Sequence, residues 1–162
     1  MSEYRLPAGY GTAEYAEKKS RFIGQVWPVK TESEAREKIE EVKKRHHDAR
    51  HNCWCYLLRE GSIVRYSDDG EPQGTAGIPM LEVFRREGVT NVVCVVTRYF
   101  GGVLLGTGGL FRAYTKATRY ALSAAAISVE QLWDRMCIDC GYRLFEQLRL
   151  LISRHGGIVE NT

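Results

Sequence analysis

Apolar and polar positions follow two different periods along this chain, and these periods predict its strands and helices. Residues 11–29 contain two extended segments around a polar cluster at 17–20, and the second segment, 22–29, ends near Pro28. Short apolar runs at 53–58 and 92–97 are typical of buried strands. Residues 63–66 follow the first of these runs after a turn that contains glycine, which predicts a hairpin.

Four segments have the apolar period of a helix. The first, over 31–47, begins with a capping-box pattern from Thr31 to Glu34 and has a narrow apolar stripe, so we expect it on a surface. The second runs over 78–87 and ends at Gly88, a residue that favours helix termination. The third, over 108–125, is the longest, and the fourth covers 142–155 between expected strands at 136–140 and 158–159.

These elements divide the chain into a larger and a smaller part. Residues 1–130 supply enough strands and helices for one α+β domain. Residues 131–162 supply a strand, a helix and the start of another strand, which are too few to close a core. This tail therefore either packs on the first domain or begins a second one.

Composition restricts the class of protein. The chain has 162 residues, of which 44% are hydrophobic and 27% are charged, as is usual for soluble globular proteins. Its apolar runs are shorter than the roughly 18–20 residues that span a bilayer, and its N-terminus lacks the apolar region of a signal peptide. Its five cysteines have no disulfide-framework spacing, which indicates reduced thiols. We expect a cytoplasmic protein with no membrane partner.

The distribution of charge along the chain is more informative about possible anionic partners than the net charge of +3. No acidic residue occurs between Gly88 and Val129, whereas four basic residues do: Arg98, Arg112, Lys116 and Arg119. On the predicted third helix, Arg112, Lys116 and Arg119 share the face opposite the apolar residues. Such a face is either an ordinary solvated surface or a surface that binds the phosphates of a nucleic acid.

A glycine-rich loop precedes this helix, with glycines at Gly101, Gly102, Gly106, Gly108 and Gly109. Free N–H groups at a helix start suit an anion, and glycine also lets a backbone approach another element closely. The spacing is not that of a P-loop, and Phe111 stands where the dinucleotide fingerprint has its third glycine. The loop is therefore either a tight structural connection or an anion site of another kind.

Candidates for acid–base chemistry are Asp68, Asp69 and His51. The two aspartates belong to a loop at 67–74 that is dense in turn-forming residues. Adjacent acids in a turn commonly accept hydrogen bonds from their own backbone, and the alternative is a Mg²⁺ or acid–base site.

A second group of candidates has metal-ligating side chains: His46, His47, His51, Cys53 and Cys55, to which Cys137 and Cys140 could add a further pair. A structural zinc site needs four ligands that converge. Residues three apart on a strand face opposite ways, so the thiols of Cys137 and Cys140 would not converge in an extended segment. We expect neither a metal nor another cofactor.

Three motifs, in this order and at close spacing, resemble the signature of the IMPACT family, also called the YigZ family: residues 51–54, 67–77 and 97–114. Residues 19–23 are similar to the opening of that family, and the resemblance covers roughly residues 15–125. One departure is Ile78, where many members have a basic residue.

The resemblance implies a fold for both parts of the chain. Residues 1–130 are expected to be similar to the second domain of the small-subunit ribosomal protein S-five, with a four-stranded sheet and helices on one face. Residues 131–162 resemble the start of a ferredoxin-like domain similar to domain V of elongation factor G, which is incomplete here.

The resemblance also suggests a function, because eukaryotic relatives regulate translation by competing for an activator of the amino-acid-starvation kinase. Our leading hypothesis is a non-catalytic cytosolic module that binds RNA, the ribosome or an acidic protein through its four basic residues, with the glycine loop close to a phosphate. The alternative is a phosphate-handling or hydrolytic enzyme with a site between the 67–77 and 101–109 loops. A third possibility is a regulator of translation that binds only proteins.

Overall fold

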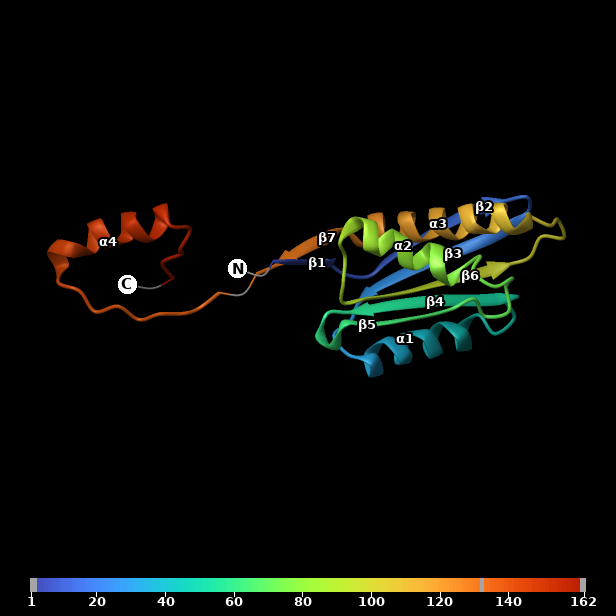
Figure 1. Ribbon diagram of the computed structural model, residues 1–162, viewed down its shortest axis with the longest axis horizontal. Coiled ribbons are helices and arrows are strands. Elements are labelled where there is room, and N and C mark those ends of the chain that lie inside the picture. The colour runs from blue at the N-terminus through green and yellow to red at the C-terminus, as the bar shows by residue number, and fades with distance from the viewer. Residues whose placement is uncertain (1–2, 132, 161–162) are drawn as a thin grey trace. The chain divides into compact units, whose positions relative to one another are not determined.

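The computed structural model describes residues 3–131 and 133–160, which form two units that divide near residue 132. The first unit contains a five-stranded sheet, a two-stranded sheet and three α-helices (Figure 1). Its elements are β1 (Tyr4–Pro7), β2 (Gly11–Glu17), β3 (Ser20–Pro28), α1 (Glu32–Arg45), β4 (His51–Leu58), a short 3₁₀ turn η1 (Glu60–Ser62), β5 (Ile63–Ser67), α2 (Gly77–Glu87), β6 (Val92–Tyr99), α3 (Gly106–Ala125) and β7 (Ile127–Glu130).

The large sheet has the strand order β2-β3-β6-β4-β5, and each neighbouring pair is antiparallel. β6 is the central strand, and its residues are buried from Val92 to Arg98. It is covered on both faces, which explains why its sequence is a continuous apolar run rather than an alternating one. The predicted strands at 53–58, 63–66 and 92–97 are confirmed.

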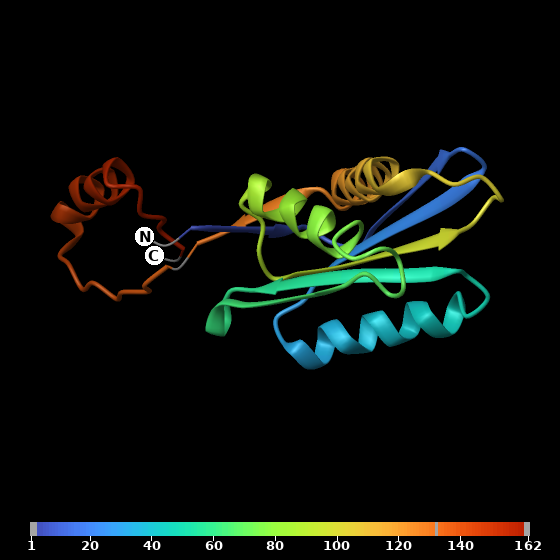
Figure 2. The ribbon, with the colours of Figure 1, turned by 45° about the vertical axis from the view of Figure 1, so that its right-hand side comes forward.

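Helices cover both faces of this sheet (Figures 1 and 2). α1 packs on one face, where Val93 and Val95 of β6 project. α2 and α3 pack on the other face, where Cys94 and Val96 project. The α+β class is confirmed, but the expected four strands and single helical face are not what the structure has.

The physical reason is the alternation of β4 and β6. Successive side chains on a strand point to opposite faces, and both faces of these two strands carry apolar residues. Each face therefore needs a cover, and the narrow stripe of α1 provides one with Ala35, Ile39 and Val42. The predicted start of this helix is confirmed, since Thr31 and Glu34 form a capping box.

α3 lies very close to β2 and β3. A Cβ at Gly24 would be only 2.5 Å from the carbonyl oxygen of Ala117, and a Cβ at Gly11 would clash with the backbone of Ala125. Glycine on the strands and alanine on the helix therefore let the two backbones approach. This packing holds the opposite face of α3 in a defined position.

β1 pairs with β7 in an antiparallel ribbon in which Leu6 is opposite Ser128. The sequence did not predict β1. Its partner is more than a hundred residues away in the chain, and four residues are too few to show a clear alternation.

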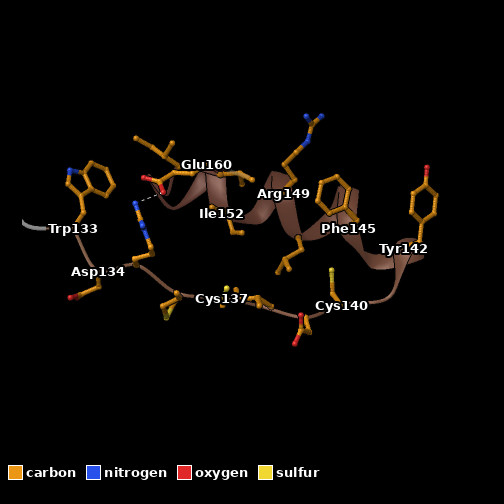
Figure 3. A pocket seen from close by; sticks show the side chains of 16 residues that line it. Trp133, Asp134, Cys137, Cys140, Tyr142, Phe145, Arg149, Ile152 and Glu160 are labelled. Carbon is orange, nitrogen blue, oxygen red and sulfur yellow. Dashed lines mark ion pairs between the residues drawn. The ribbon is translucent and has the colours of Figure 1, made fainter. Parts of the chain in front are cut away.

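The second unit contains α4 (Tyr142–Arg154), which confirms the helix predicted over 142–155. The helix lies beside an extended segment that includes Cys137 and Cys140 (Figure 3). The strands expected at 136–140 and 158–159 are not formed in the part of this unit that the structure describes. No other strand is present among residues 133–160 to pair with them. That these residues begin a ferredoxin-like domain stays a prediction.

Candidate functional site

Asp68 holds the 67–77 loop in its conformation. Its carboxylate accepts hydrogen bonds from the backbone N–H groups of Gly74 at 2.8 Å, Ala76 at 3.1 Å and Gly77 at 2.8 Å. The bonds from Ala76 and Gly77 satisfy N–H groups at the start of α2 that have no partner within the helix. The Asp68 side chain is therefore engaged with the backbone.

Asp69 and His51 connect the same loop to the first residues of β4. The Asp69 carboxylate accepts from the backbone N–H of Asn52 at 2.7 Å. The backbone carbonyl oxygen of Asp69 lies 2.8 Å from Nδ1 of His51. A carbonyl can only accept, so this contact places the proton of the imidazole on Nδ1. The other ring nitrogen, Nε2, lies 3.7 Å from a carboxylate oxygen of Glu71.

Glu71 is the centre of a buried network. One of its carboxylate oxygens accepts from the guanidinium of Arg98 at 2.7 Å and from the hydroxyl of Tyr114 at 2.7 Å. Glu71 is 7% exposed and Arg98 is 5% exposed. Burial and the neighbouring Cys53 and Glu71 raise the pKa of the Tyr114 phenol well above its ordinary value, so the phenol stays protonated and donates.

The guanidinium of Arg98 lies near two aromatic rings, 5.5 Å from the centre of Phe22 and 5.4 Å from that of Phe100. The guanidinium also lies 3.3 Å from the hydroxyl of Ser20, and its Nε atom has no hydrogen-bond partner among the described residues. Arg98 thus joins β6 to β3, to the 67–77 loop and, through Glu71, to α3. We call Ser20, Glu71, Arg98 and Tyr114 the buried ionic network.

Cys53 borders this network as a protonated thiol. Its sulfur lies 2.9 Å from the carbonyl oxygen of Asp68 and 3.3 Å from the Tyr114 hydroxyl. Burial raises the pKa of the Cys53 thiol far above its ordinary value. Because the thiolate is the reactive form of cysteine, this thiol is a poor nucleophile.

The glycine loop packs on the turn between β2 and β3. A Cβ at Gly101 would clash with the carbonyl oxygen of Lys19, and the Gly101 N–H donates to the Ser20 hydroxyl at 3.4 Å. Gly102 and Gly106 have φ angles of +89° and +73°, which side chains rarely adopt. These three glycines have structural roles. Gly106 begins α3, and Gly108 and Gly109 lie in the first turn of the same helix.

The three basic residues of α3 are exposed on one face of the helix: Arg112, Lys116 and Arg119. We call them the basic helix face. Within the described parts of the chain, no ion pair joins any of them to a carboxylate. Arg98 does not join this face, because it is buried and paired with Glu71.

The cysteines considered as metal ligands do not lie in one unit. Cys53 and Cys55 are buried in the first unit, and Cys137 and Cys140 are exposed in the second. Among the described residues, no three histidine, cysteine, aspartate or glutamate side chains gather in a group that could hold a metal ion.

Sequence reasoning did not single out Glu71, Tyr114 or Ser20 as parts of one cluster. The burial of Arg98 could have been predicted from the alternation of side chains along β6. Arg98 lies two residues after Val96 and four after Cys94, so its side chain projects to the face that α2 and α3 cover. A cation on a buried face needs a buried anion, and Glu71 is that partner.

Comparison with known proteins identifies the family. The family model of the Impact N-terminal domain matches residues 18–122. The chain belongs to the IMPACT family. The matched residues include the 67–77 loop, the glycine loop, the buried ionic network and the basic helix face.

Curated members of the IMPACT family are similar to this chain. YvyE of Bacillus subtilis is 44% identical over 133 residues, which cover 82% of this chain and 61% of that protein. YigZ of Escherichia coli is 34% identical over an alignment of 165 positions, which covers the whole chain and 81% of that protein. A solved structure, described as a crystal structure of a hypothetical protein, has a TM-score of 0.76 at 32% identity, covering 99% of this chain and 80% of that one.

No helix in the described parts of the chain is long and apolar enough to cross a membrane.

Proposed function

We propose that this protein is a cytosolic, non-catalytic binding module linked to translation, and that its basic helix face binds RNA. The link to translation is suggested by the family resemblance. The observation that carries RNA binding is the basic helix face, where Arg112, Lys116 and Arg119 are exposed without a carboxylate partner among the described residues. Like charges at this spacing destabilise a helix by a few tenths of a kcal/mol, and bound phosphates would relieve that repulsion.

The geometry around the acidic loop supports binding over hydrolysis. The carboxylates of Asp68 and Asp69 accept from backbone N–H groups, and Glu71 is paired with Arg98. A general base needs a carboxylate or imidazole that can reach a substrate proton. The enzyme alternative therefore depends on His51, whose Nε2 lies near Glu71.

Fluorescence anisotropy with a labelled RNA oligomer, measured over a range of salt concentrations, tests the proposal. Replacing Arg112 and Lys116 together by alanine should weaken binding and reduce the magnitude of the slope of log K against log salt by about 1.4 to 1.8, because each of the two lost phosphate contacts contributes about 0.7 to 0.9. The matched control replaces Arg36 and Lys44 by alanine, which removes the same charge from α1 on the other face of the sheet.

The control variant should bind as the unaltered protein does. If RNA does not bind at low salt, or if the two double variants lose affinity equally, the proposal is wrong. Capture of a protein partner that persists after nuclease treatment, without RNA binding, would instead favour the protein-binding regulator.

A further inference from the structure

Two aromatic rings border the basic helix face: Tyr120, which is exposed, and Tyr15, which is partly buried. Tyr120 follows Lys116 by four residues and so lies one turn further along the same side of α3. Its side chain is 48% exposed. β2 places Tyr15 beside it, with the two ring centres 6.1 Å apart and the ring planes inclined by 72°.

Tyr15 and Lys116 are in direct contact. The Lys116 ammonium lies 5.2 Å from the centre of the Tyr15 ring and 3.5 Å from its hydroxyl. The Tyr15 hydroxyl also donates to the carboxylate of Glu17 at 2.6 Å, and its ring packs against buried Phe22. These contacts hold Tyr15 in place, so a cation and two aromatic rings form one continuous surface.

The backbone under this surface is fixed. The opposite side of α3 is buried, and its backbone lies against Gly24 of β3. Tyr120 does not fill the core, since about half of its surface is open to solvent. A half-exposed ring beside cations that have no carboxylate partner among the described residues is an arrangement on which single-stranded bases stack while the cations contact the phosphates.

We propose that Tyr120, supported by Tyr15, stacks on the bases of single-stranded RNA, so that this surface prefers single strands to duplexes; this inference rests on the proposed RNA binding by the basic helix face. In a duplex the base faces are covered by their neighbours, and only phosphates and groove edges are accessible. The cations contribute to binding of both forms, whereas the rings contribute only to binding of the single strand.

The test compares a labelled single-stranded oligoadenylate with an RNA duplex of the same length. Tyr120→Ala should weaken single-strand binding about tenfold, the effect of losing one stacked base, and change duplex binding less than twofold. Tyr120→Phe keeps the ring and should bind like the unaltered protein. Tyr10→Ala is the matched control, because Tyr10 is 50% exposed but lies beside Trp27 on the α1 face.

The outcomes separate this inference from the function on which it rests. Equal affinity of the unaltered protein for both RNA forms, or an equal loss for both in Tyr120→Ala with its circular dichroism unchanged, overturns stacking while RNA binding stands. Loss of binding in Tyr120→Phe also overturns it, because the ring is retained. If neither RNA form binds, both proposals fail.

Discussion

Replacing Glu71 by glutamine tests the buried ionic network most directly. The substitution keeps the size of the side chain and removes the negative charge that lies 2.7 Å from the Arg98 guanidinium. Arg98 is only 5% exposed, so water cannot replace the lost partner. Removing one partner of a buried ion pair costs about 3–5 kcal/mol, and because the amide can still accept one hydrogen bond we expect about 3 kcal/mol.

The assay is urea unfolding followed by circular dichroism, with the free energy of unfolding obtained by linear extrapolation. Glu82→Gln is the matched control, since Glu82 forms an exposed pair with Arg85 at 2.9 Å. That pair should contribute less than about 1 kcal/mol. The comparison therefore holds the chemistry of the substitution constant and changes only the burial of the pair.

A double variant shows whether the loss comes from the stranded Arg98. Adding Arg98→Met to Glu71→Gln removes the unpaired cation. The loss of free energy of unfolding in the double variant should therefore be smaller than the sum of the losses in the two single variants, by at least about 1 kcal/mol. If the two losses simply add, or if Glu71→Gln unfolds at the same urea concentration as Glu82→Gln, the reasoning is refuted.

Two further predictions concern other titratable groups. In the native protein at neutral pH, a thiol reagent should modify Cys137 and Cys140 rapidly, because both are exposed. The three buried cysteines should react only after unfolding in urea. Burial also raises the pKa of Cys94 to about 12, which disfavours its reactive thiolate. Fast reaction of a third thiol would contradict this burial. The pKa of His46 lies below its ordinary value of 6.5, chiefly because of burial, so the unfolded state binds its proton first and stability should fall as the pH drops through 6.5 toward the native pKa. The unfolding midpoint of His46→Asn should depend less on pH over this window, and an unchanged dependence would count against the assignment.

Local patterns were sufficient to predict most elements of the first unit. The capping box at Thr31 and the apolar run of β6 are each encoded in consecutive residues, and both predictions are confirmed. The turn chemistry of Asp68 also agrees with its sequence, since an aspartate in a turn commonly accepts from nearby backbone N–H groups. What these features share is that each depends on neighbours within about ten residues.

Features that depend on distant partners were not predicted. β1 forms because distant residues, chiefly those of β7, lie beside it, and α1 covers the second face because strand order places β4 next to β6. The pairing of Glu71 with Arg98 joins residues that are 27 positions apart. From their charges alone, Glu71 belonged to a candidate acid–base loop and Arg98 to a candidate basic surface. In the structure they form one buried ion pair whose charges balance.

The division between buried and exposed residues also separates two properties that can be measured independently. The buried ionic network ties β3, β6, α3 and the 67–77 loop together, so its loss should lower the free energy of unfolding. The basic helix face lies on the solvent side of the same helix, and removing its repelling charges should leave stability unchanged or slightly higher. Glu71→Gln should therefore lower stability but leave the RNA affinity of the folded protein unaltered. The double substitution of Arg112 and Lys116 should lower RNA affinity without lowering stability. A parallel loss of both properties in either variant would mean that the two sets of residues act as one site.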